Sequence, residues 1–331
     1  MHTVQTHSRG LLLALALATV AALLGEAFPL VGGPVIGIVL GLAVNNLFHP
    51  GERFRPGIGF AGKQILQWSI IALGVGLNFT QVAHTGMQSL EVTLVTVATA
   101  FVSAIVLGKL LGVPDKLKVL IGVGTAICGG SAIAAVTPII KPDDHETAFS
   151  ISTIFLFNLV AVLLFPLLGH LLGLSDKGFG LWAGTAINDT SSVVAAGYSY
   201  SQLAGQYATI VKLTRATLII PVCLVMALIV AHQNHKAGSG NFSLKRIFPW
   251  FILWFVVASL ASTFGLIPAA VFPYAHHIAQ FLIVVALTAI GLSSNLGQMR
   301  GTGFRPILLG LGVWICVASS SLVVQHLMGQ L

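Results

Sequence analysis

Two stretches of this chain, sixty residues apart, repeat almost the same residues, and both place polar groups inside apolar segments. The first reads GTAICGGSAIAA, from Gly124 to Ala135, and the second reads GTAINDTSSVVA, from Gly184 to Ala195. In a bilayer an unpaired backbone amide costs several kcal/mol, so irregular backbone persists only where it lines a cavity walled by protein or water. A duplicated interruption of this kind is typical of the substrate site of a transporter.

The composition places the chain in a membrane. Of its 331 residues 56% are hydrophobic and 8% are charged, whereas a soluble domain carries about 25% charged residues. The formal charge of +7 does not indicate a nucleic-acid partner, because no basic cluster alternates with aromatic residues. The three cysteines fit neither a disulfide framework nor a metal-ligand spacing, so no metal and no cofactor are expected.

Apolar runs of roughly 17 to 25 residues are candidates for membrane spans. The run from Gly10 to Gly25 could be a signal peptide, but it has no clear cleavage site and further spans follow at once, which favours a first membrane helix. We expect a single transmembrane domain over 1–331, with an extra N-terminal helix at 1–26, a first repeat at 29–173 and a second, permuted repeat at 178–331. The expected spans are 9–26, 29–48, 59–80, 88–113, 117–139, 145–173, 178–198, 206–231, 244–267, 273–297 and 303–328.

The distribution of Lys and Arg predicts the orientation, because cytoplasmic loops carry an excess of them. With a cytoplasmic N-terminus, the opposite loops near residues 27, 84, 202 and 270 receive none, whereas Lys141 and Lys177 fall on opposite sides. A multi-pass plasma-membrane protein is therefore expected. The basic residues on the cytoplasmic side would be Arg9, Arg53, Arg55, Lys63, Lys109, Lys116, Lys118, Lys236, Lys245, Arg246, Arg300 and Arg305.

The internal duplication predicts the architecture. Segment 117–173 aligns with 178–231 at an offset of 60, and 59–111 aligns more weakly with 273–328 at an offset of 215. Two halves that alternate access around one site show such repeats. We expect an all-α polytopic membrane protein with about nine to eleven transmembrane helices, in inverted repeats with two re-entrant or broken helices. Whether 117–139 and 178–198 are hairpins or broken spans stays open, and a tandem duplication of ordinary spans is the alternative.

Three ionisable residues lie deep within expected spans: Asp189, Lys212 and Arg215. Such residues are costly in a membrane and are functional candidates by default. The two cations are spaced i,i+3 and so share one helical face. Two cations against one acid leave a surplus of positive charge, which favours an anion. Asp189 is expected to bind a coupling proton or Na⁺.

The ends of the two interruptions support an anion site. Ser131 and Ser191 are expected to cap the helices that follow, and helix N-termini offer unpaired N–H groups and the positive end of the dipole. Gly129 and Gly130 allow close approach of the backbone. The predicted substrate-binding residues are Cys128, Gly129, Gly130, Ser131, Asn188, Thr190, Ser191, Ser192, Lys212 and Arg215.

Each of these assignments has a simpler alternative. Asp189 could only cap its helix or pair with a cation, and the glycines could serve close helix packing. Lys212 and Arg215 could extend their charged ends to the membrane surface. Cys128 stands where a nucleophile could, but no intramembrane His accompanies it, which favours a packing residue.

The stretches GTAICGGSAIAAVTPIIK (Gly124 to Lys141), DDHETAFS (Asp143 to Ser150) and GTAINDTSSVVAAG (Gly184 to Gly197) carry a family resemblance. With them the chain resembles, over nearly its whole length, the YeiH family of bacterial membrane proteins, to which sulfate export is ascribed. That family is similar to the large class of cation/proton antiporters and anion transporters built from inverted repeats. The resemblance implies a secondary transporter of the bacterial inner membrane.

The sequence thus predicts a secondary transporter of a small anion, with sulfate, sulfite or a sulfonate as the substrate. The main rival is a cation/proton antiporter centred on Asp189, and a passive channel is a further alternative. No enzyme activity is expected, since a membrane-embedded hydrolase would need a nucleophile–base pair or a metal motif. The expected partners are the anion, a coupling proton or Na⁺ and the lipid bilayer, and a homo-oligomer remains open.

Overall fold

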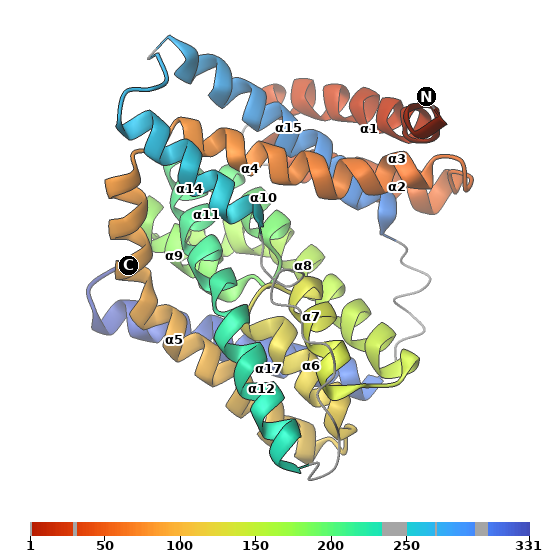
Figure 1. Ribbon diagram of the computed structural model, residues 1–331, viewed down its shortest axis with the longest axis vertical. Helices are drawn as coiled ribbons and strands as arrows, with labels where there is room; N and C mark the ends of the chain where they lie inside the picture. Colours follow the sequence, from red (N-terminus) through yellow and green to blue (C-terminus); the bar gives the residue numbers. More distant parts are fainter. Residues whose placement is uncertain (1, 29–31, 234–249, 269, 295–303) are drawn as a thin grey trace. The chain divides into compact units, whose positions relative to one another are not determined.

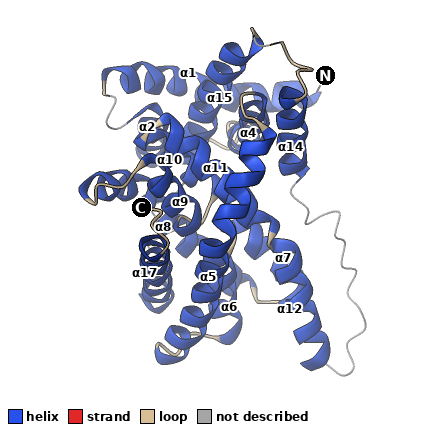
Figure 2. Ribbon diagram, turned by 90° about the vertical axis from the view of Figure 1, so that its left-hand side faces the viewer, coloured by secondary structure: helices blue, strands red, loops and turns tan. Residues whose placement is uncertain are grey.

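The computed structural model describes residues 2–28, 32–233, 250–268, 270–294 and 304–331, and within these ranges the chain is helical and has no strand (Figures 1 and 2). The elements are α1 His2–Ala27, α2 Gly32–Phe48, α3 Arg55–Phe60, the π-helical turn η1 Ala61–Ile65, α4 Leu66–Val75, α5 Phe79–Leu110, α6 Asp115–Ala126, α7 Gly130–Ile140, α8 Asp144–Leu171, α9 Asp176–Ala186, α10 Thr190–Tyr200, α11 Gln202–Thr217, α12 Ile219–Gln233, α14 Trp250–Thr263, α15 Val271–Ser293 and α17 Phe304–Leu327.

The described residues contain seven helices that are long and apolar enough to cross a membrane. Three shorter apolar helices, Gly33–Phe48, Gly130–Ile140 and Trp250–Thr263, accompany them. This confirms an all-α polytopic membrane protein. The first residues of the expected span 244–267, most of the loop before it, and Arg300 lie outside the described residues. The seven helices are His7–Ala27, Arg55–Val75, Phe79–Leu110, Glu146–Leu171, Gln202–Val230, Val271–Ser293 and Phe304–Leu327.

Helix α5 begins nine residues before the expected start of the span 88–113. Its first turns contain polar residues, which lower the hydropathy but do not prevent a helix. Asn78 precedes the helix, and its Oδ1 accepts a hydrogen bond of 2.8 Å from the N–H of Thr80. Asn is a favoured residue at this position, because its side chain satisfies an amide that the helix leaves free.

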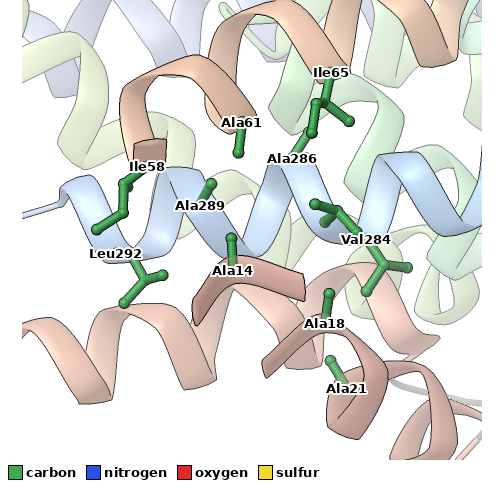
Figure 3. Close-up of a cluster of buried hydrophobic side chains, with 11 residues drawn as sticks. Ala14, Ala18, Ala21, Ile58, Ala61, Ile65, Val284, Ala286, Ala289 and Leu292 are labelled. Carbon is green, nitrogen blue, oxygen red and sulfur yellow. The ribbon is translucent and has the colours of Figure 1, made fainter. Parts of the chain in front are cut away.

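The described helices form two compact units, and the first comprises Met1–Thr85, Val194–Gln206 and Trp250–Gly297. Figure 3 shows side chains from α1, from α3 with η1, and from α15 pointing toward one another in its core. In the same unit the backbones of helices α2 and α15 are in direct contact. A Cβ on Gly291 would lie 2.3 Å from the carbonyl oxygen of Ile38, and one on Gly41 would lie 2.2 Å from that of Thr288. Small residues permit such backbone contact between membrane helices.

The second unit comprises Gly86–Val193, Tyr207–Pro249 and Gln298–Leu331, and it contains both interruptions. Here α9 is fixed along α17. Trp182 Nε1 donates to the carbonyl oxygen of Ala318 at 3.0 Å, and the hydroxyls of Thr185 and Ser321 are 2.7 Å apart. The ring of Phe165 from α8 stacks on Trp182 with 4.1 Å between the ring centres. These contacts hold α9 so that its last turn faces the site described next.

Candidate functional site

The first interruption folds the chain back on itself. Helix α6 ends at Ala126 and α7 begins at Gly130, and Gly129 between them has φ +69°, a left-handed conformation that favours glycine. Lys116, in the first turn of α6, donates from Nζ to the carbonyl oxygen of Lys141, just after α7, at 2.7 Å. A straight helix would separate these residues by about 37 Å. The α6–α7 segment therefore folds as a helical hairpin, not as two helices that continue in one direction.

The second interruption separates α9, which ends at Ala186, from α10, which begins at Thr190. The backbone of Ile187 is extended, with φ −85° and ψ 135°. The Asp189 carboxylate accepts hydrogen bonds from the N–H of Ser191, at 3.0 Å, and from the Ser191 hydroxyl. The backbone N–H of Asp189 donates to Asn158 Oδ1 of α8 at 3.2 Å. Asp189 thus caps α10, as one of its expected roles required.

The expectation that Ser131 and Ser191 cap these helices is wrong. Gly129 is the residue before α7, where no side chain caps the helix, and Asp189 is the residue before α10. Both serines are instead the second residues of their helices. The interruptions are shorter than expected, because Gly129 turns the chain sharply and the Asp189 carboxylate starts α10 early.

The two interruptions lie against each other. A Cβ on Gly129 would be 3.5 Å from the Cβ of Asp189 and 3.4 Å from a methyl carbon of Ile154. The absence of a side chain at position 129 therefore brings the first break into contact with the acid of the second.

Lys212 of α11 bridges the two interrupted helices. Its side chain has no exposed surface, and Nζ donates to the carbonyl oxygens of Ile127 at 2.8 Å and Ile187 at 2.9 Å. These two acceptors are equivalent under the 60-residue offset between the repeats. One ammonium group thus binds the equivalent carbonyl oxygen in both interruptions.

Arg215 repeats this arrangement one helical turn later. It is also fully buried; its Nε donates to the carbonyl oxygen of Ala126 at 2.7 Å, and its two terminal nitrogens donate to those of Thr125 and Thr185. The last carbonyls of a helix have no partner within the helix and carry the negative end of its dipole. Lys212 and Arg215 therefore neutralise and hold the C-terminal ends of α6 and α9. Their complete burial excludes the alternative in which they extend to the membrane surface.

The two cations have no carboxylate partner in the described part of the chain. Its two recorded ion pairs are Arg55–Glu52 and Lys118–Asp115. Asp189 is close enough to act electrostatically on Lys212, but its carboxylate is bound to Ser191 instead. Removing an unpaired charge from water costs free energy. The five hydrogen bonds to carbonyl oxygens offset only part of this cost for the two buried positive charges.

All the predicted site residues belong to the second unit and to the two breaks or to α11. Ser131 is exposed, Gly130 and Asp189 are partly exposed, and the other eight are buried. Sequence reasoning missed the backbone carbonyls that receive the cations and did not select Asn158. The pairing of Thr125 with Thr185 and of Ile127 with Ile187 was visible in the repeat alignment and could have indicated these acceptors. Among the described residues no group of His, Cys, Asp and Glu could hold a metal ion.

These features define a class: a multi-pass α-helical membrane protein in which buried cations join two interrupted helices. The chain belongs to the family described as Conserved hypothetical protein 698, which matches residues 9–310.

Relatives match over almost the full length. The UPF0324 membrane protein FN0533 of Fusobacterium nucleatum subsp. nucleatum is 42% identical over 340 residues, which cover 97% of this chain and 98% of that protein. The UPF0324 membrane protein SpyM3_0740 of Streptococcus pyogenes serotype M3 is 45% identical, with 98% and 99% covered. A UPF0324 membrane protein of Clostridium tetani is 38% identical, with 99% of each chain covered.

Proposed function

We propose that this protein is a secondary transporter of a small anion. The observation that carries the proposal is the burial of Lys212 and Arg215, without a carboxylate partner among the described residues, where two interrupted helices meet. Ionisable residues within a membrane mark transport pathways. Interrupted helices from duplicated segments are the usual location of a transporter's substrate.

The start of α7 is the position that suits the anion best. No side chain caps this helix, so the N–H groups of Gly130 and Ser131 are free of the carboxylate that occupies the equivalent end of α10. Free N–H groups at a helix N-terminus bind anions. Lys212 and Arg215, which bind the carbonyl oxygens at the ends of α6 and α9, contribute positive electrostatic potential at this position. The remaining predicted residues, Cys128, Gly129, Asn188, Thr190, Ser191 and Ser192, would surround the bound anion.

The proposal extends to substrate, membrane and topology. The resemblance to the YeiH family favours sulfate, sulfite or a sulfonate, exported across the bacterial inner membrane. The excess of Lys and Arg in alternate loops favours a cytoplasmic N-terminus. Asp189 is proposed to carry the coupling proton or cation, because it is the partly exposed acid at the junction of the two breaks.

Flux into proteoliposomes tests the proposal. The purified protein should take up radiolabelled sulfate, sulfite or a sulfonate in a saturable way, which a passive channel would not. Lys212→Gln and Arg215→Gln should abolish uptake. Lys63→Gln, which removes the same charge from an exposed residue, should leave it unchanged. Saturable anion uptake that survives loss of both buried cations would contradict the proposed site.

A cation/proton antiporter is the second candidate. It is favoured by the side-chain oxygens near the break: Asp189 itself, Asn158 beside it, and Asn188, whose buried Oδ1 has no hydrogen-bond partner. Proton efflux from proteoliposomes upon addition of Na⁺ or K⁺ would support this reading if Asp189→Asn abolished it. The same preparation would then take up none of the labelled anions.

A further inference from the structure

The charges at the two interruptions can be added up. Four helix ends meet there: the C-terminal ends of α6 and α9 and the N-terminal ends of α7 and α10. Each end carries about half an elementary charge, negative at a C-terminus and positive at an N-terminus, so the four cancel. With Asp189 ionised, before it takes up a coupling proton, Lys212 and Arg215 contribute two positive charges and Asp189 one negative charge. Cys128 is the other titratable group that acts on Lys212 in the described part of the chain, and a thiol is neutral.

One positive charge is therefore left over in a buried place. The hydrogen bonds show the same surplus. An ammonium and a guanidinium together have eight N–H bonds. Five of them point to carbonyl oxygens of the two breaks, and the other three have no acceptor among the described residues. Buried donors without acceptors and a buried net charge both indicate a ligand that supplies oxygen atoms and negative charge.

We propose that the substrate is an oxyanion with a single negative charge, such as a sulfonate, rather than a dianion such as sulfate. This rests on the proposed anion transport and narrows its substrate class. A monoanion neutralises the site, whereas a dianion leaves one uncompensated negative charge in a medium of low dielectric constant, where interactions between charges are strong. Asp189 thus sets the charge of the substrate without needing to touch it.

Methanesulfonate and sulfate provide the test, since both present oxygens on a tetrahedral sulfur and they differ by one charge. Their dissociation constants are measured by thermal shift of the purified protein at constant ionic strength, because a ligand raises apparent stability according to its occupancy. The wild type should bind methanesulfonate about ten-fold more tightly than sulfate. Asp189→Asn should shift the ratio of the two constants toward sulfate by about thirty-fold, the effect of one charge about 8 Å away at an effective dielectric constant of about 20.

The variants are chosen so that folding is preserved. Asn caps helices as well as Asp does, so Asp189→Asn should keep α10 intact, and Asp189→Ser repeats the test with another neutral capping residue. Asp176→Asn removes a negative charge from the first turn of α9, away from the breaks, and should leave the ratio unchanged.

The outcomes separate this inference from the proposed function. Tighter binding of sulfate by the wild type, or an unchanged ratio in both Asp189 variants, overturns the inference while anion transport stands. Failure of the wild type to bind or transport any anion overturns the proposed function itself.

Discussion

At the scale of single residues, Arg215 does what solvent or glycine usually does at the end of a helix. Helix C-termini are commonly satisfied by water or by a left-handed glycine that lets following amides reach back. After α6 the left-handed Gly129 supplies one such amide, to the carbonyl oxygen of Gly124 at 2.9 Å, but the carbonyls of Thr125, Ala126 and Thr185 need another donor. The guanidinium has donors in a planar fork and so reaches Thr125, Ala126 and Thr185 at once. A single side chain thereby joins the two repeats.

This predicts that charge alone cannot replace Arg215. Arg215→Lys keeps the positive charge but cannot reach all three carbonyls, and each buried acceptor left without a donor costs about 1–3 kcal/mol. Thermal unfolding in detergent should show a clear loss of stability. The matched control is Arg55→Lys, at an exposed arginine with an ion pair to Glu52, where little change is expected. Equal melting temperatures for the two variants would contradict the clamping role.

The sequence predicted that Lys212 and Arg215 are buried but not what they bind. Asp189, Lys212 and Arg215 stand out because charges are rare in apolar segments. Their partners are backbone carbonyls, whose positions depend on the residue at which each half-helix ends. The sequence also misplaced the starts of the second half-helices: Ser131 and Ser191 were expected as caps, but Gly129 and Asp189, two residues earlier, precede these helices. An error of two residues rotates a backbone group by about 200° around the helix axis, more than half a turn.

At the scale of elements, the hairpin of α6 and α7 makes a prediction about sidedness. Lys116 and Lys141 should both be reached from the same side of the membrane, because the chain returns to where it entered. Each is replaced by cysteine in a background without the three native cysteines. Both should react with a membrane-impermeant maleimide in inside-out vesicles, and neither in intact cells. Labelling of the two positions from opposite sides would show that the segment crosses the membrane.

Hydropathy located the helices well and their internal breaks poorly. The expected span 206–231 is mostly apolar, yet it consists of α11 and α12, which separate at Leu218. Pro221 explains the separation, since proline has no N–H for the carbonyl of Thr217 and its ring crowds that carbonyl. Apolar composition reports that a segment is in the membrane, whereas breaks depend on single residues such as Pro221 and Gly129.

At the scale of the whole molecule, the α6–α7 hairpin constrains the rest of the topology. A hairpin does not change the side of the membrane, so every later segment is displaced by one crossing relative to a chain of simple spans. With the proposed cytoplasmic N-terminus, a crossing by α9 and α10 together would place the Lys and Arg residues of the segment 236–246 away from the cytoplasm. That would oppose the excess of cytoplasmic Lys and Arg. The α6–α7 hairpin and the cytoplasmic excess of Lys and Arg are compatible only if the second interrupted segment is also a hairpin. This second hairpin then enters the membrane from the opposite face.

We therefore predict that both ends of the second segment are reached from outside the cell. Lys177 and Gln202 flank α9 and α10, and both are exposed. As single cysteines they should react with an impermeant maleimide in intact cells, which is the reverse of the pattern for positions 116 and 141. Two hairpins that enter from opposite faces and touch at their tips would give the repeats inverted orientations, as alternating access requires. If position 202 is labelled only from the cytoplasmic side, the second segment crosses the membrane and the inverted arrangement is lost.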